Sequence, residues 1–198
     1  YLDEYINNEP FCEIAWHQLG RQYYIIDKFD EALRAFDYAI IIDEDFLGAY
    51  IEKAKTLEAL ERFEEAIDHY MVAIQLEDGT PFIYLRLGLC YEKINDKKQA
   101  LKYYNLTIKE DPLLEKGWLA LTSLYVKEKN YQKALFFINK ALNINNENAA
   151  YWSRFAEVNI KLNLFEEAAN AFQKCIDLED YRLDIFIALI DVLHFLGE

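Results

Sequence analysis

The sequence has few of the residues that build tight turns, because only six glycines and three prolines occur in 198 residues. A sandwich or barrel of many short strands needs turn-forming residues at each reversal, so this scarcity argues against an all-β fold. The three cysteines, Cys12, Cys90 and Cys175, lie far apart and form no C-x-x-C pair. This pattern indicates structural thiols in a reducing compartment rather than a disulfide framework or a metal site.

Long apolar runs and an excess of basic charge are also missing. No segment approaches the roughly 18 consecutive apolar residues of a membrane-spanning helix. Lys and Arg number 21 against 35 Asp and Glu, which gives a net charge of −14. Binding to phosphates needs a basic surface, so neither nucleic acid nor an anionic membrane is an expected partner. Residues 1–4 lack the basic start of a signal peptide, and we expect a cytoplasmic location.

The dominant feature of the sequence is a period of 34 residues. Bulky side chains recur at this interval without an insertion or deletion at Trp16, Tyr50, Tyr84, Trp118, Trp152 and Phe186. Four residues later comes a column of small or short residues, broken in the sixth unit by Ile190: Gly20, Ala54, Gly88, Thr122 and Ala156. A further column holds Ala32, Ala66, Ala100, Ala134 and Ala168. Several columns in phase indicate one structural unit repeated along the chain.

Each unit has the pattern of two helices. Apolar positions three and four residues apart lie on one face of a helix, and each unit carries two such stripes. The small residues allow two helix axes to approach closely while a neighbouring aromatic ring fills the space beside them. Polar pairs such as Asp27-Lys28 and Asn95-Asp96 separate the stripes, and they are short enough to join antiparallel helices. The sequence therefore predicts an all-α fold.

The motif Trp16-x2-Leu19-Gly20-x2-Tyr23, followed by Ala32, Phe36 and Ala39, resembles the tetratricopeptide repeat family, as does Tyr84-x2-Leu87-Gly88-x2-Tyr91. The resemblance implies a right-handed superhelical solenoid of antiparallel helix pairs, with the first helix of each pair lining a concave face. Lys53, Thr107 and Asn159 depart from the family pattern. We expect locally looser packing at these three positions.

The resemblance also divides the chain into a single array. We expect residues 1–12 to be the end of a truncated preceding repeat, and residues 183–198 to be the first helix of a truncated sixth repeat. Between them we expect five full repeats, at 13–46, 47–80, 81–114, 115–148 and 149–182.

Residues that could carry catalysis do not converge in the sequence. It contains no Gly-rich phosphate loop, no G-x-S-x-G and no H-E-x-x-H motif. His17, His69 and His194 fall at different positions of different repeats. The acidic pairs 64–65 and 166–167 open second helices, where negative charge complements the helix N-terminus. We therefore expect no enzymatic activity, no cofactor and no metal site.

A binding surface is predicted on the first helices. Positions 2, 5, 9 and 12 of each first helix form a stripe away from the packing face, and the family resemblance places this stripe in the groove. In the central units the predicted groove carries large apolar side chains at Phe82, Leu85, Leu89, Leu119 and Val126, and in the last full unit it holds Ala150, Ser153, Glu157 and Ile160. An exposed apolar patch is a candidate interaction site. The alternative is that the array buries these side chains against one another.

We expect an apolar or amphipathic peptide segment in this groove. Its polar or acidic flanks would contact the cations Arg21, Lys55, Arg86 and Arg154. The carboxylate clamp of chaperone-binding members of the family is not expected, because among its matching positions only Arg86 agrees and Glu52 would repel a carboxylate.

The sequence thus predicts a scaffold or adaptor that binds another protein. Two alternatives stay open: a regulatory or sensory arm of a larger enzyme or signalling protein, and a self-assembling structural array. The segment 183–196 is apolar on nearly every face. A terminal helix of a solenoid normally has a polar outer face, so we expect either a covering helix or a homodimer through this segment.

Overall fold

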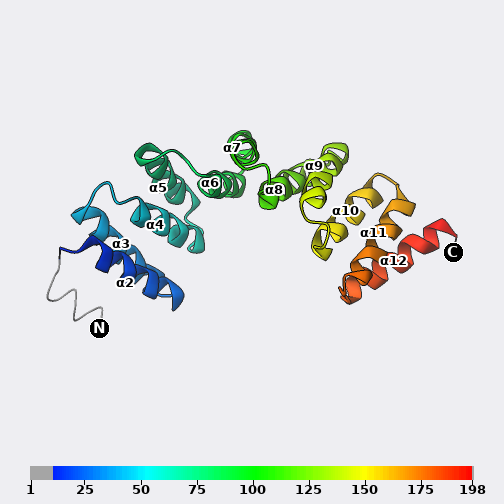
Figure 1. Cartoon of the computed structure of the whole chain (residues 1–198), viewed down its shortest axis with the longest axis horizontal. Coiled ribbons are helices and arrows are strands. Elements are labelled where there is room, and N and C mark those ends of the chain that lie inside the picture. The colour runs from blue at the N-terminus through cyan, green and yellow to red at the C-terminus, as the bar shows by residue number, and fades with distance from the viewer. Residues whose placement is uncertain (1–10, 198) are drawn as a thin grey trace. The chain divides into compact units, whose positions relative to one another are not determined.

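The computed structural model describes residues 11–197, and Figure 1 shows helices joined by short turns. This part of the chain contains eleven α-helices and no strand, which confirms the predicted all-α fold. The first helices of the repeats are α2 (Glu13–Ile25), α4 (Leu47–Ala59), α6 (Pro81–Lys93), α8 (Glu115–Lys127), α10 (Ala149–Lys161) and α12 (Leu183–Leu196). The second helices are α3 (Phe29–Ile42), α5 (Phe63–Leu76), α7 (Lys97–Glu110), α9 (Tyr131–Ile144) and α11 (Phe165–Asp177). The expectations for residues 1–10 and 198 lie outside the described residues.

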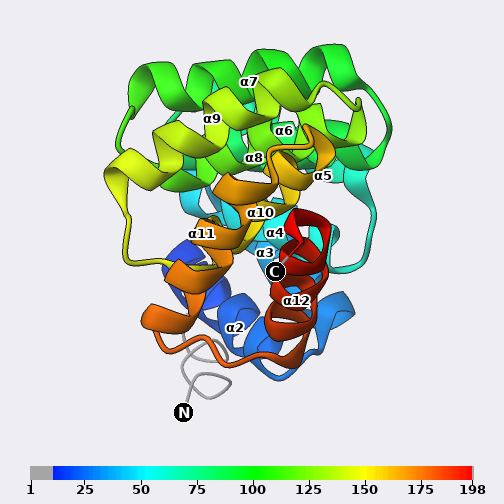
Figure 2. The same cartoon turned by 90° about the vertical axis from the view of Figure 1, so that its right-hand side faces the viewer.

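The described part of the chain divides into two compact units, an N-terminal unit that ends at residue 107 and a C-terminal unit that begins at residue 108. Within each unit, first and second helices pack as hairpins, and each second helix also packs on the first helix that follows it. Figure 2 shows this order in the C-terminal unit, where α10, α11 and α12 follow one another. Each unit is therefore a stack of helical hairpins, which is the solenoid arrangement that the sequence predicts.

The turn between first and second helix has one conformation in all five hairpins. Its central residue adopts a positive φ of 57° to 63°, although none of the five is glycine: Asp27, Glu61, Asn95, Lys129 and Asn163. In the first hairpin the Lys28 N–H donates to the Tyr23 carbonyl at 2.9 Å, and the Asp27 N–H donates to the Tyr24 carbonyl at 3.1 Å. This is the Schellman pattern, which satisfies carbonyls that the end of a helix leaves unpaired.

The column of small residues brings the two helices of a hairpin close together. A Cβ atom at Gly20 would lie 2.5 Å from the ring of Phe36, and a Cβ at Gly88 would overlap the ring of Tyr104 in the same way. Such distances are shorter than van der Waals contact allows, so the aromatic ring occupies the space that the glycine leaves. Phe36 and Tyr104 are both fully buried, as expected for rings packed against the small column.

The polar side chains at the three departures from the family pattern are satisfied. Lys53 is only 16% exposed, and its ammonium group forms a 2.6 Å ion pair with Asp37 on the preceding α3. Thr107 and Asn159 are fully buried. The Thr107 hydroxyl donates to a backbone carbonyl one turn earlier at 3.0 Å, and the Asn159 amide does the same at 2.9 Å. Each of these polar groups therefore has a partner, and looser packing at the three positions stays a prediction.

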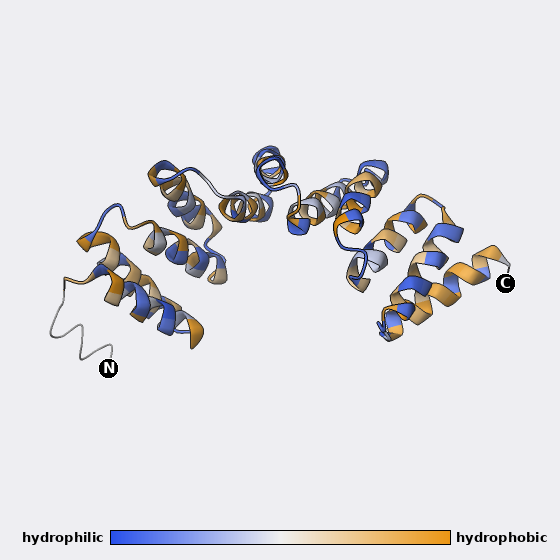
Figure 3. Cartoon of the chain, viewed as in Figure 1, coloured by the Kyte–Doolittle hydropathy of each residue, from blue (hydrophilic) through white to orange (hydrophobic). Residues whose placement is uncertain are grey.

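Apolar residues cover most of α12, whereas the other helices alternate between polar and apolar faces (Figure 3). The exposed side chains of α12 include Leu183, Ile187, Ile190 and Phe195. None of the helices between residues 11 and 197 has both the length and the apolar character needed to cross a bilayer.

Candidate functional site

Arg86, a predicted groove cation, forms an ion pair within the N-terminal unit. Its Nη2 atom lies 2.7 Å from Glu58 Oε2, and its Nε atom donates to Glu58 Oε1 at 2.8 Å. The Tyr70 hydroxyl donates to the same Oε1 atom at 2.5 Å. Burial, followed by the negative charge of Glu58, raises the pKa of Tyr70 well above its ordinary value, so the phenol stays protonated as the donor. Arg86 therefore links α6 to α4, and a ligand carboxylate would have to compete with Glu58.

The other two predicted cations of this unit lie near His17. The Lys55 ammonium is 2.8 Å from Glu52 Oε2 and 5.9 Å from the centre of the Tyr24 ring. Arg21 is exposed. The buried Nε2 atom of His17 has no hydrogen-bond partner among the described residues. Burial lowers the pKa of His17, and Glu52 partly offsets this effect.

The apolar side chains of the predicted groove differ in their exposure. Phe82 is 45% exposed, whereas Leu85 is only 7% exposed, which fits the alternative expectation that the array buries this side chain. Leu89, Leu119 and Val126 are partly exposed. Phe82, Leu85 and Leu89 belong to the N-terminal unit, and Leu119 and Val126 belong to the C-terminal unit. That all five line one continuous groove stays a prediction.

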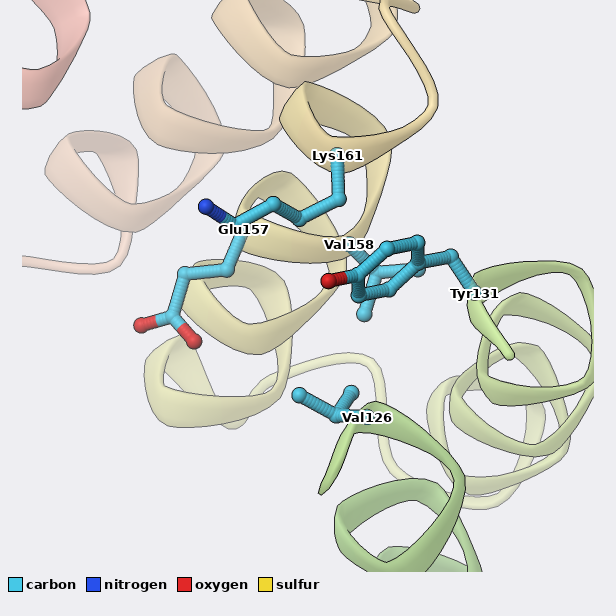
Figure 4. Close-up of a pocket in the computed structure, with 5 residues that line it drawn as sticks. All are labelled: Val126, Tyr131, Glu157, Val158 and Lys161. Carbon is cyan, nitrogen blue, oxygen red and sulfur yellow. The ribbon is translucent and has the colours of Figure 1, made fainter. Parts of the chain in front are cut away.

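A pocket of about 190 Å³ lies between α8, α9 and α10 in the C-terminal unit. We call it the α8–α10 pocket, and its lining residues are Val126, Tyr131, Glu157, Val158 and Lys161. Tyr131 is the first residue of α9 and Lys161 is the last residue of α10. Figure 4 shows the polar ends of Tyr131, Glu157 and Lys161 on the same side of the pocket, with the two valines beside the ring. The pocket therefore has apolar walls and a polar rim.

A second hollow of about 220 Å³ adjoins the first, because Glu157 lines both. We call it the α10–α12 pocket, and its lining residues are Ser153, Glu157, Ile160, Phe172, Asp184, Ile185 and Ala188. The Glu157 carboxylate accepts a 2.9 Å hydrogen bond from Arg154, a predicted groove cation. The surface of the C-terminal unit over α8, α10 and α12, the first-helix face, thus carries two neighbouring hollows that share Glu157.

The sequence predicted part of this surface. Val126, Ser153, Glu157 and Ile160 stand at the predicted stripe positions, and they line one or both hollows. Tyr131, Val158 and Lys161 were missed, because they lie outside the stripe. Two of them could have been found by comparing repeats. Lys161 ends a first helix and Tyr131 opens the second helix before it, and the residue types at these two positions can be compared from one repeat to the next.

Side chains that could bind a metal ion do not cluster in the part of the chain that the structure describes. Within residues 11–197, no cluster of three or more His, Cys, Asp or Glu side chains could hold a metal ion. Burial raises the pKa of the Cys90 thiol to about 12 and that of Cys175 to about 11. Both thiols are therefore protonated at neutral pH and poorly nucleophilic.

Family models of the tetratricopeptide repeat match residues 47–79, 83–113, 116–148 and 149–181. The chain belongs to the tetratricopeptide repeat family. A search of curated proteins found no match.

Solved structures of tetratricopeptide repeat proteins have the same fold. YrrB, described as having an unusual peptide-binding site, is 16% identical with a TM-score of 0.72, over 94% of this chain and 96% of that one. A repeat protein from Parabacteroides merdae is 15% identical with a TM-score of 0.79, over 93% of this chain and 73% of that one. A chain of the Cut9–Hcn1 hetero-tetramer of APC/C is 22% identical with a TM-score of 0.73, over 98% of this chain and 39% of that one.

Proposed function

We propose that this tetratricopeptide repeat protein is a non-enzymatic scaffold or adaptor that binds a peptide segment of another protein on the first-helix face of its C-terminal unit. The observation that carries the proposal is the pair of adjoining hollows on either side of Glu157. Binding sites commonly combine apolar walls with a few polar groups that fix the orientation of the ligand. An apolar or amphipathic segment could place one side chain in each hollow.

The family supports a protein as the partner. YrrB is described as a peptide-binding protein, and the Cut9–Hcn1 structure is a protein assembly. In the N-terminal unit, the predicted groove residues Phe82 and Arg21 have exposed side chains, and we propose them as contacts for a partner segment on that unit.

The expected affinity is modest. Burial of one large apolar side chain contributes about 1.5–3 kcal/mol, so two hollows contribute about 3–6 kcal/mol before the cost of association. A short peptide that uses only the two hollows should therefore bind with a Kd of about millimolar or weaker, and tighter binding would need contacts beyond the hollows.

Selection of peptides from a displayed random library tests the proposal. Peptides selected on the whole chain should bind a Ser153→Arg variant at least about tenfold more weakly, because the larger side chain would occupy the α10–α12 pocket. Asn170→Arg is the matched control, because Asn170 is exposed on α11 and lines neither hollow. Selected peptides that bind both variants as tightly as the wild type would show that the first-helix face is not the binding surface.

A second copy of the chain is a further candidate partner, through α12. Leu183, Ile187, Ile190 and Phe195 form a run of exposed apolar side chains along this helix. Exposed apolar surface of this kind favours association. We propose a homodimer through α12 at high protein concentration.

A further inference from the structure

The residue types that line the α8–α10 pocket recur one repeat later with a single change of chemistry. Its five lining residues, Val126, Tyr131, Glu157, Val158 and Lys161, correspond in order to Ile160, Phe165, Asp191, Val192 and Phe195. Four of the five pairs keep the same character: aliphatic, aromatic, acidic and valine. At the fifth position the first pocket has a lysine where the next repeat has a phenylalanine.

One repeat later, a residue of α12 covers Phe165, the aromatic residue that opens α11. The ring of Phe195 stacks on the ring of Phe165, with centroids 5.2 Å apart and planes 7° from parallel. In the N-terminal unit the Lys93 ammonium takes the equivalent place, 5.9 Å from the centre of the Phe63 ring. A ring or a cation therefore covers the opening aromatic residue in both cases.

The ring of Tyr131 has no such cover. Lys161 makes no ion pair, hydrogen bond or ring contact with any residue between 11 and 197, and the hollow remains beside the Tyr131 ring. The volume of about 190 Å³ is sufficient for a phenyl ring, since a cavity of about 150 Å³ binds benzene.

We infer that the α8–α10 pocket receives an aromatic side chain from the partner protein, stacked on Tyr131 as Phe195 stacks on Phe165. This inference rests on the proposed function and names the chemistry of one of its two hollows. The partner thus supplies to this pocket the kind of ring that, in the next repeat, Phe195 of this chain supplies.

The rim of the pocket selects the residues beside that ring. Glu157 already has a cationic partner in Arg154, at 2.9 Å. The Lys161 ammonium and the Tyr131 hydroxyl are hydrogen-bond donors, and Figure 4 shows both groups on the same side of the pocket. An Asp or Glu next to the aromatic residue would therefore find donors, whereas a Lys or Arg there would be repelled by Lys161. The favoured segment is an aromatic residue flanked by acids.

Capped pentapeptides of the sequence Gly-Asp-X-Asp-Gly test this chemistry, with Phe, Leu or Ala at X, together with Gly-Lys-Phe-Lys-Gly. Binding is followed on the whole chain by the NMR shifts of the methyl groups of Val126 and Val158. The Asp-Phe-Asp peptide should bind about tenfold more tightly than the Ala peptide and more tightly than the Lys-Phe-Lys peptide. Equal affinity of the Phe and Ala peptides, or Phe shifts only at methyls outside the pocket, would overturn the inference.

Three variants sharpen the test. Lys161→Phe should place the chain's own ring on Tyr131 and weaken binding of the Asp-Phe-Asp peptide at least about tenfold. Lys161→Gln should keep the preference for Phe over Ala but lose most of the preference for Asp over Lys. Tyr131→Leu, which removes the ring without filling the pocket, should weaken the Phe peptide and leave the Leu peptide unchanged. Unaltered binding of the Asp-Phe-Asp peptide to both Lys161→Phe and Tyr131→Leu would also overturn the inference.

The outcomes separate this inference from the proposed function. One outcome is that library peptides lose affinity for Ser153→Arg, lack an aromatic residue and bind Lys161→Phe as tightly as the wild type. In that case the chain binds on its first-helix face, and the inference of an aromatic occupant is wrong. If Ser153→Arg blocks nothing, the proposed function itself fails.

Discussion

Individual polar residues hold neighbouring repeats of the N-terminal unit together. Lys53 pairs with Asp37 across the first two repeats, and Arg86 pairs with Glu58 across the second and third. Glu58 is only 10% exposed, so its carboxylate depends on Arg86 and on the Tyr70 hydroxyl for compensation. The loss of one partner from such a pair is more damaging than the loss of both.

We predict that Arg86→Met lowers the free energy of unfolding by about 2 kcal/mol, because it leaves the Glu58 carboxylate poorly compensated. The double variant Glu58→Gln and Arg86→Met should recover part of this loss, since it removes the unpaired charge. Urea unfolding of the two variants and the wild type measures both effects. A single variant as stable as the wild type would mean that water compensates Glu58 fully.

Two histidines of the N-terminal unit make stability depend on pH. Burial lowers the pKa of His17 and of His69 below the ordinary value of 6.5, and Lys53 lowers the pKa of His69 further while Asp37 raises it. The unfolded chain therefore binds protons more readily than the folded chain in this range. The stabilising contribution of each neutral histidine is present above pH about 6.5 and is lost as the pH falls through the lowered values.

We predict that the free energy of unfolding falls less between pH 7 and pH 5 in the double variant His17→Gln and His69→Gln than in the wild type. Chemical denaturation at several pH values measures the difference. His194→Gln, at an exposed position on α12, is the control and should keep the wild-type dependence. A double variant with the wild-type slope would show that carboxylates alone govern the response.

At the scale of the element, the hairpin turn carries avoidable strain. A left-handed conformation costs a residue with a Cβ roughly 1 kcal/mol more than glycine, yet Lys129 adopts φ 58°. We predict that Lys129→Gly raises the free energy of unfolding by up to about 1 kcal/mol. Asn170→Gly, in the middle of α11, should lower it by about the same order because glycine disfavours helix interiors. Thermal unfolding of both variants measures the sign of each change in the free energy of unfolding. A Lys129→Gly variant that is less stable than the wild type would contradict the presence of strain at Lys129.

The helices were predictable from the sequence because their signals are local. The spacing of Trp16, Gly20 and Ala32, repeated every 34 residues, specifies both helices and the turn between them. Side-chain environments were less predictable, because they depend on the neighbouring repeat. Lys53 replaces an apolar residue, but its partner Asp37 lies 16 residues away on another helix.

The candidate site shows the same limit. Leu85 stands at a stripe position yet is buried, because a periodic pattern gives the direction of a side chain and not what covers it. Tyr131 and Lys161 lie outside the stripe, and their pocket depends on a helix end meeting the start of the previous second helix. In the sequence, this pocket is marked only by a lysine, Lys161, at the position where the next repeat has a phenylalanine, Phe195.

At the scale of the whole molecule, α12 is where the repeat pattern changes. Ile190 occupies the column in which earlier repeats have Gly, Ala or Thr, and its side chain is exposed. In the first and third repeats the glycine of that column admits an aromatic ring of the second helix. A large side chain there is suited to contact with a different surface.

We predict that the weight-average mass of the chain rises with concentration in sedimentation equilibrium, because α12 associates with α12 of a second copy. Ile187→Glu together with Ile190→Glu should abolish the rise, whereas Asp191→Asn, at an exposed polar position of the same helix, should not. A wild-type chain that stays monomeric at high concentration would contradict the homodimer.

The pairs Asp37–Lys53 and Glu58–Arg86 also bear on how freely the repeats could be rearranged. The apolar columns are nearly interchangeable between repeats, so by themselves they would tolerate many orders of assembly. Each of these charges finds its counterpart only when the first, second and third repeats follow one another in sequence. A chain with the second and third repeats exchanged would separate both cations from their carboxylates, so ionic pairing gives a modular array a fixed order.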